Sequence, residues 1–130
     1  MMRLLLFAVA LCVAALPLVA VAAPPDGMPM QCNANALSAR ERGRRETLVE
    51  DLFPKAEVTE VADGYQLVWK DQPNAFGKLT EFIGIERRCC PFLDFELRVS
   101  GPQDPVTLVL HGNDDVKKFI KDSELFQGKP

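Results

Sequence analysis

Two adjacent cysteines, Cys89 and Cys90, stand directly before Pro91 in the segment GIERRCCPFLDFELRV. Because a proline disfavours helical backbone at the residue before it, a helix that includes these cysteines is expected to end at Cys90. Thiolates favour soft metal ions such as Zn(II), Cu(I) or Hg(II), and three sulfurs with one further donor suit a tetrahedral ion. Together with Cys32, the two cysteines therefore form a candidate metal site, although their spacing is not the paired C-x-x-C pattern of a zinc motif.

Glu86 and His111 are the candidates for an additional ligand or for a side chain that orients one. At about 100° per residue, Glu86 lies one helical turn before Cys90, on the same side as Phe76 and Leu79. A carboxylate on an apolar helix face is costly unless it is paired, so Glu86 is expected to have a partner. We expect Glu86→Gln to weaken ion binding and to change the stability of the metal-free protein little. His111 is the only histidine, and a lone histidine at a strand end is more often simply exposed.

Other chemistries remain open for the cysteines. Cys90 could pack as a small hydrophobe, and in an oxidising compartment Cys32 could form a disulfide with Cys89 or with Cys90. A bond between the two neighbours would strain the peptide that joins them. A thiol-redox protein is the enzymatic alternative, but the dipole at a helix C-terminus is unfavourable to a thiolate, and nearby arginines compensate only in part. A disulfide-stabilised domain that binds a partner without catalysis is a third interpretation, and no catalytic residue is assigned.

The N-terminal sequence predicts export. MMRLLLFAVALCVAALPLVAVAAPP contains one cation, Arg3, then an apolar run and the small residues Ala20-Val21-Ala22, the pattern of a bacterial secretory signal peptide cleaved after Ala22. The alternative is an uncleaved anchor, since the stretch is near the roughly 17–25 residues that span a bilayer. Cys12 would be removed with the signal. The mature protein is expected to be periplasmic or secreted, and its odd number of cysteines leaves one outside any disulfide.

We expect three parts: a signal peptide over residues 1–22, a flexible lead over 23–36 and a single α+β domain over 37–130. The net charge of the full chain is −3, and removal of Arg3 makes it more negative by one unit. This mild acidity gives no reason to expect nucleic acid or an anionic membrane as partner, so the expected partner is a metal ion or a thiol. The arginines at positions 40, 42, 44 and 45 are interpreted as a solvated helix face.

Periodicity and capping signals predict the order α-β-β-α-β-β-α. The first helix, over 38–53, opens with a capping box of Ser38 and Glu41, and the second helix covers 73–90. Asp63-Gly64 is a strong hairpin signal. Hairpins give antiparallel pairs, so we expect an α+β fold with a four-stranded, mainly antiparallel sheet built from two hairpins and helices on one face. The strand residues predicted to face the core are Tyr65, Leu67, Trp69, Leu93, Phe95, Leu97 and Val99.

The segments QCNANALSARER, DGYQLVW, ERRCCPFLDFEL and GNDDVKKFI resemble a group of small bacterial proteins of unassigned function that share an E-R-x-C-C-P-F-L-x-F core. The resemblance covers most of the mature chain. It implies a single α+β domain and a loose link to heavy-metal handling, and its motif positions are Cys32, Glu86, Cys89, Cys90 and Phe92. The export signal is a departure from this group, because it moves the thiols out of a reducing cytosol. The sequence as a whole predicts an exported protein that binds a thiophilic metal ion.

Overall fold

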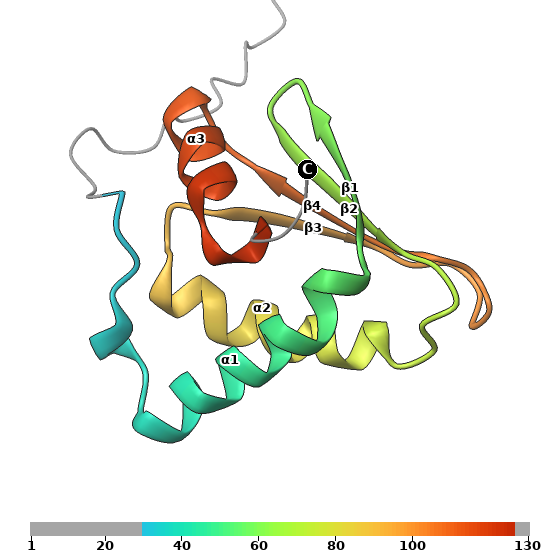
Figure 1. Ribbon diagram of the computed structural model, residues 1–130, viewed down its shortest axis with the longest axis horizontal. Helices are drawn as coiled ribbons and strands as arrows, with labels where there is room; N and C mark the ends of the chain where they lie inside the picture. The colour runs from blue at the N-terminus through green and yellow to red at the C-terminus, as the bar shows by residue number, and fades with distance from the viewer. Residues whose placement is uncertain (1–29, 127–130) are drawn as a thin grey trace, which may run out of the picture.

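The computed structural model describes residues 30–126 (Figure 1). Its helices are α1 (Ala39–Leu52), α2 (Ala75–Cys89) and α3 (Asp114–Asp122), and its strands are β1 (Glu57–Val61), β2 (Gly64–Trp69), β3 (Asp94–Arg98) and β4 (Val106–His111). Three short 3-10 helices are η1 (Ala34–Ala36), η2 (Phe53–Lys55) and η3 (Glu124–Phe126). The predicted α-β-β-α-β-β-α order is confirmed. The predicted signal peptide and residues 23–29 of the predicted lead lie outside the described residues.

The four strands form one antiparallel sheet in the order β1-β2-β4-β3. The two predicted hairpins, β1–β2 and β3–β4, are joined at the centre of the sheet by the pairing of β2 with β4, where Gly64 lies opposite His111. A side chain on Gly64 would overlap the backbone carbonyl of Leu110, so glycine is required where the first hairpin turns beside β4. The mainly antiparallel sheet built from two hairpins is therefore confirmed.

One face of the sheet packs against the helices and the other is mostly polar. Alternation along each strand puts side chains of opposite register on opposite faces. The core face carries the buried side chains of Tyr65, Leu67, Trp69, Leu108 and Leu110, joined by the partly buried Val58, Phe95, Leu97 and Val106. Val99 was predicted to belong to this face, but it is 49% exposed because β3 ends at Arg98, so the alternation no longer applies there.

Helix α1 begins as its capping signal predicts. Ser38 Oγ accepts a hydrogen bond from the amide of Glu41, and a carboxylate oxygen of Glu41 accepts one from the amide of Ser38. The other Glu41 oxygen lies 2.6 Å from Arg88 Nη2 in the last turn of α2. The hydrogen bond from Arg88, with those from Ser38, lowers the pKa of Glu41 to about 2. The cap thus also fixes the start of α1 beside the end of α2, where the cysteines lie.

Helix α2 buries a stripe that is shifted from the predicted one. Its buried residues are Ala75, Leu79, Phe82, Ile85, Glu86 and Cys89. Phe76 was predicted to share this face but is 49% exposed, because it lies about 100° around the helix from Ala75 and so outside the stripe. Within residues 30–126, no helix combines the length and the apolar character needed to cross a membrane.

Candidate cysteine site at the end of helix α2

The end of α2 brings both adjacent cysteines into one cluster with Cys32. Cys90 is the C-cap of the helix, and its backbone has left helical geometry, with φ −119° and ψ 74°. Pro91 favours this departure. As a result, the two side chains no longer diverge as neighbours on a regular helix would. The Sγ atoms of Cys32, Cys89 and Cys90 all lie within 4.8 Å of one another, so the predicted approach of Cys32 to this corner is confirmed.

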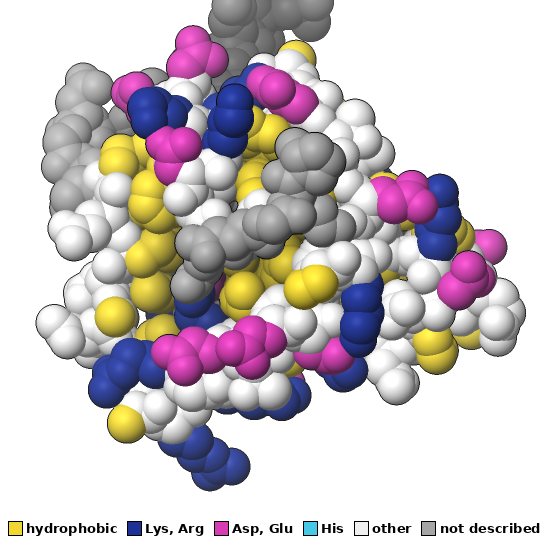
Figure 2. Space-filling model, viewed as in Figure 1, with side chains coloured by type: hydrophobic (Ala, Val, Ile, Leu, Met, Phe, Trp, Pro, Cys, Tyr) yellow, Lys and Arg dark blue, Asp and Glu magenta, His cyan; other side chains and the backbone are white. Residues whose placement is uncertain are grey.

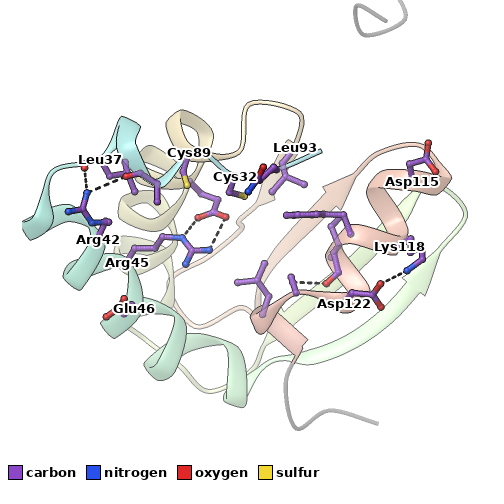
Figure 3. A pocket seen from close by; sticks show the side chains of 17 residues that line it. Cys32, Leu37, Arg42, Arg45, Glu46, Cys89, Leu93, Asp115, Lys118 and Asp122 are labelled. Atoms are coloured by element: carbon purple, nitrogen blue, oxygen red, sulfur yellow. Dashed lines mark hydrogen bonds and ion pairs between the residues drawn. The ribbon is translucent and has the colours of Figure 1, made fainter. Parts of the chain in front are cut away.

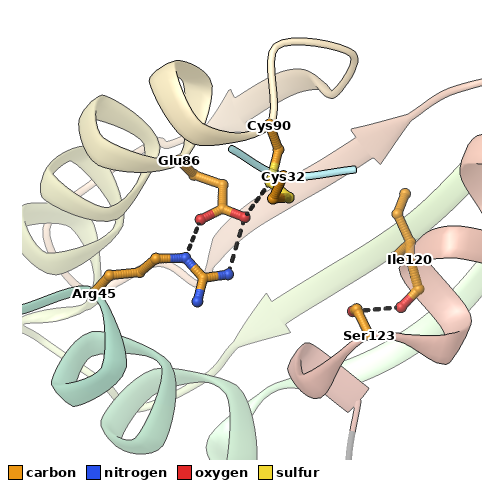
Figure 4. Close-up of a disulfide and its surroundings, with 6 residues drawn as sticks. All are labelled: Cys32, Arg45, Glu86, Cys90, Ile120 and Ser123. Atoms are coloured by element: carbon orange, nitrogen blue, oxygen red, sulfur yellow. Dashed lines mark hydrogen bonds and ion pairs between the residues drawn. A yellow bond between two sulfur atoms is a disulfide. The ribbon is translucent and has the colours of Figure 1, made fainter. Parts of the chain in front are cut away.

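A backbone hydrogen bond holds the Cys32 segment against α2. The amide of Asn33 donates to the carbonyl oxygen of Cys89 at 2.7 Å, and Asn33 Oδ1 caps η1 by accepting from the amide of Asn35. Cys32 forms a disulfide with Cys90, and their Cα atoms are 4.4 Å apart (Figure 4), within the usual range of about 4.4–6.8 Å. Of the two pairings that the sequence left open for Cys32, the structure therefore shows the one with Cys90.

The three cysteine residues differ in their exposure to solvent. Cys32 is partly exposed, Cys89 is 4% exposed and Cys90 is 0% exposed. The disulfide does not include Cys89, whose sulfur nevertheless lies within 4.8 Å of both bonded sulfurs. A reagent that approaches from solvent therefore meets Cys32 before it meets Cys90.

Glu86 has the partner that its burial requires. It is 2% exposed, and Arg45 of α1 donates to it twice, from Nε to Oε2 at 2.5 Å and from Nη2 to Oε1 at 3.1 Å (Figure 4). The same Oε1 lies 3.2 Å from Cys90 Sγ. The prediction that Arg45 belongs to a solvated face is wrong, because its side chain is only 16% exposed and points inward to Glu86.

Two of the remaining arginines of that cluster, Arg44 and Arg42, make separate contacts. Arg44 pairs with Glu81 of α2 at the surface, with both side chains more than 40% exposed. Arg42 donates from Nη1 to the backbone carbonyl oxygens of Leu37 and Ala34, at 2.6 and 3.3 Å. Arg42 thereby holds η1, and with it the Cys32 segment, against the first turn of α1.

A pocket of about 720 Å³ opens onto the cysteine site (Figure 3). Cys32 and Cys89 line it together with Arg45 and Glu86, whereas Cys90 does not line it. Its apolar walls come from η1 and the residue after it, from the residue before β3, and from α3 and η3, through Ala34, Leu37, Leu93, Phe119, Ile120 and Leu125. Figure 2 shows hydrophobic side chains gathered between α1 and α3 on this side of the molecule. Sequence reasoning did not find the pocket, because its walls come from segments far apart in the chain.

His111 lies in a different environment. Its Nδ1 is 3.0 Å from Asp63 Oδ2 and its Nε2 is 2.9 Å from Glu96 Oε2, on the polar face of the sheet. Burial alone lowers the pKa of His111, but the hydrogen bonds to Glu96 and Asp63 outweigh it and raise that pKa above its usual value. Among the described residues, the group that could hold a metal ion consists of the three cysteines and does not include His111.

The geometry allows two chemical states of the same three sulfurs. In the oxidised state Cys32 and Cys90 form a disulfide with the Cys89 sulfur beside it. In the reduced state the three sulfurs, which lie within 4.8 Å of one another, could together hold a metal ion. Comparisons of the chain with protein-family models, with curated proteins and with solved structures found no match.

Proposed function

We propose that the protein is exported and binds a thiophilic metal ion through Cys32, Cys89 and Cys90 when the Cys32–Cys90 disulfide is reduced. The observation that carries this proposal is that the three Sγ atoms lie within 4.8 Å of one another. In a tetrahedral thiolate site with metal–sulfur bonds of about 2.3 Å, the sulfurs are about 3.8 Å apart. After reduction the Cys32 and Cys90 sulfurs would have to move apart to about this distance, whereas Cys89 Sγ, within 4.8 Å of both, would have to approach by about 1 Å at most.

The neighbouring ion pair places a cation and a possible oxygen ligand at the cysteine corner. Three thiolates around a divalent ion leave a net negative charge, and the guanidinium of Arg45 lies at the same corner through its contact with Glu86. Glu86 Oε1 is already 3.2 Å from Cys90 Sγ, so Glu86 orients the Cys90 sulfur or supplies an oxygen ligand by releasing one hydrogen bond from Arg45. Loss of a group that orients a metal ligand typically costs about 10–100-fold in affinity. His111 is not part of the proposed site.

The disulfide makes binding depend on redox state. A sulfur in a disulfide is not available as a thiolate ligand, so the oxidised protein offers only Cys89 from the cluster. In an oxidising compartment the disulfide is the expected resting form, and a reductant would have to open it before an ion is bound. Zn(II), Cu(I) and Hg(II) are the ions to test.

Native mass spectrometry and titration calorimetry test the proposal on the protein from residue 23 onward. Protein reduced with a phosphine, then freed of reductant without oxygen, is expected to bind one Zn(II) or Hg(II) ion per chain. The oxidised protein should bind at least about 100-fold more weakly, because it lacks two of the three sulfur ligands. Cys89→Ser is the informative variant, since it removes one ligand and leaves the disulfide partners in place. No binding by the reduced protein, or equal binding by Cys89→Ser, would overturn the proposal.

A thiol-redox protein is the second candidate, favoured by the position of the third sulfur. Because Cys89 Sγ lies close to both bonded sulfurs, a mixed disulfide formed at Cys32 could be resolved by either neighbour. This function predicts catalytic turnover of a disulfide substrate by the reduced protein. It also predicts that Cys89→Ser slows turnover while metal affinity is absent in all forms. A stoichiometric reaction without turnover would exclude it.

A further inference from the structure

The pocket beside the cysteine site is lined by only one of the two disulfide-bonded cysteines. Its volume of about 720 Å³ is within the range of roughly 300–1,000 Å³ that holds small organic molecules. Of the two cysteines in the disulfide, only Cys32 lines the pocket, while the Cys90 residue is 0% exposed. A nucleophile bound in the pocket can therefore reach the disulfide only at Cys32.

Two ion pairs lie at the pocket beside its apolar walls, and Arg42, Glu46 and Asp115 also line it. Arg45 is paired with Glu86, and Lys118 of α3 is paired with Asp122. The walls include Leu37, Leu93 and Ile120, all at least 95% buried as residues, with Phe119 on the α3 side. An apolar body loses contact with water in such a site and gains binding free energy in proportion to the area buried.

We infer that the pocket binds a small organic thiol with an apolar body, and that this thiol opens the Cys32–Cys90 disulfide. The thiolate attacks Cys32 Sγ, a new S–S bond forms between the ligand and Cys32, and the Cys32–Cys90 bond breaks. Cys90 leaves as a thiolate and takes up the proton that the attacking thiol gave to solvent. A second thiol then attacks the ligand sulfur of the mixed disulfide, which releases the ligand as its disulfide and leaves Cys32 reduced. Two thiols thus supply the two electrons that reduce one protein disulfide.

The sulfur that leaves in this step, Cys90, lies beside the ion pair of Glu86 and Arg45, which can hold it after it is protonated. Its sulfur is 3.2 Å from Glu86 Oε1, and Arg45 Nη2 is 3.1 Å from that same oxygen. The thiol of Cys90, once formed, can donate to the Glu86 carboxylate, which would hold it away from the mixed disulfide at Cys32. The rate of thiol–disulfide exchange depends on which sulfur is attacked and on access to it. The difference in exposure between Cys32 and Cys90 therefore favours attack at Cys32.

This inference rests on the proposed function, because it supplies the reductant that makes the three sulfurs available to an ion. The test uses the oxidised protein and no metal. Benzyl mercaptan and 2-mercaptoethanol are compared as reductants, because their thiols are similar in acidity and differ in apolar body. Each rate is divided by the rate of the same thiol with a small linear disulfide. The normalised rate with benzyl mercaptan is expected to be at least about tenfold higher and to saturate with concentration, and rapid acid quench should place the adduct on Cys32.

Two tryptophan substitutions in η1 provide a matched pair. Ala34 lines the pocket, whereas Ala36, at the other end of the same 3-10 helix, does not, and both are exposed. Ala34→Trp is expected to fill part of the pocket and remove the advantage of benzyl mercaptan, and Ala36→Trp should retain it. Equal normalised rates for the two thiols, an adduct on Cys90, or an unchanged advantage in Ala34→Trp would overturn the inference. Ion binding by phosphine-reduced protein does not involve the thiol, so the proposed function would stand or fall separately.

Discussion

The ion pair between Arg45 and Glu86 gives the sharpest prediction for stability. Glu86→Gln removes the negative charge from a side chain that is 2% exposed and leaves Arg45, 16% exposed, with a neutral neighbour. The substitution keeps the shape of the side chain, so the core around Phe82 and Leu79 does not have to repack. The expected effect therefore comes from the charge and its hydrogen bonds.

The size of the effect follows from the burial of the two partners. Removing one partner of a fully buried ion pair typically costs about 3–5 kcal/mol. Arg45 retains some contact with water, and the amide oxygen of glutamine can still accept one of its two hydrogen bonds, so we expect a loss of about 2–3 kcal/mol in the free energy of unfolding. For a domain of this size, that corresponds to a fall of roughly 10–20 °C in Tm. This differs from the small effect that the sequence alone predicts, because Arg45 was not known to be the partner.

The assay is urea unfolding of the oxidised protein, with the disulfide intact in every variant. Arg45→Met, Glu86→Gln and the double variant complete a thermodynamic cycle, and the double variant should lose less stability than the sum of the single losses, by about 1.5–3 kcal/mol. The matched control is Glu81→Gln. Glu81 also pairs with an arginine of α1, Arg44, across the same two helices, but at the surface, with the two side chains 42% and 44% exposed. Water already screens this second pair, so its loss should change Tm far less.

Equal losses from Glu86→Gln and Glu81→Gln would refute the reasoning, because burial is the main difference between the two pairs. A coupling energy near zero in the Arg45 and Glu86 cycle would refute it as well. In that case the carboxylate would be stabilised by groups other than Arg45.

Three further predictions concern other parts of the molecule. The pKa of the single histidine, His111, should lie above about 6.5 when measured by NMR. Because this pKa is raised in the folded state, the contribution of His111 to stability should be complete below about pH 6.5 and be lost as the pH rises through the folded pKa. His111→Gln should therefore destabilise the protein more at pH 5.5 than at pH 9. Reduction of the Cys32–Cys90 disulfide, which spans 58 positions, should lower the free energy of unfolding by about 4 kcal/mol if loop entropy dominates. Urea unfolding with and without phosphine measures this loss, and an unchanged unfolding midpoint would contradict it. Intact mass of exported protein should correspond to a chain that begins at Ala23, and a mass that includes Met1 would show that the signal is not cleaved there.

Much of the fold could be predicted because its signals are local. The capping box at Ser38, the hairpin at Asp63-Gly64 and the proline after Cys90 each act within a few residues, and each lies where the structure has the corresponding boundary. The errors at Phe76 and Val99 also have a local origin. Val99 continues the alternating pattern beyond the end of β3, and periodicity carries no information on where a strand stops. Phe76 lies beside the buried stripe of α2, which periodicity placed at a slightly different angle around the helix.

The site was predicted in part, for a physical reason. Burial of a carboxylate requires a partner, so the sequence indicated that Glu86 would be paired. It could not indicate which cation would be chosen, because four arginines lie within six positions of α1 and only the packing of α1 on α2 turns Arg45 inward. Likewise, the identity of the disulfide partner depended on how the backbone turns at Cys90, and the pocket depended on the placement of α3.

The position of β4 has a consequence for how the chain can reach this structure. Although β4 is the last strand to be synthesised, it lies between β2 and β3, and β3 pairs with no other strand. If the chain crosses a membrane from its N-terminus, as proposed, β4 cannot pair with β2 and β3 until residue 111 has emerged from the membrane. All three cysteines of the cluster emerge earlier. Oxidation can then precede folding, at a stage when nothing distinguishes Cys90 from Cys89 as the partner of Cys32. A fraction of molecules should therefore first acquire the Cys32–Cys89 bond and depend on disulfide exchange, with their own third thiol as the attacking group, to reach the native pairing.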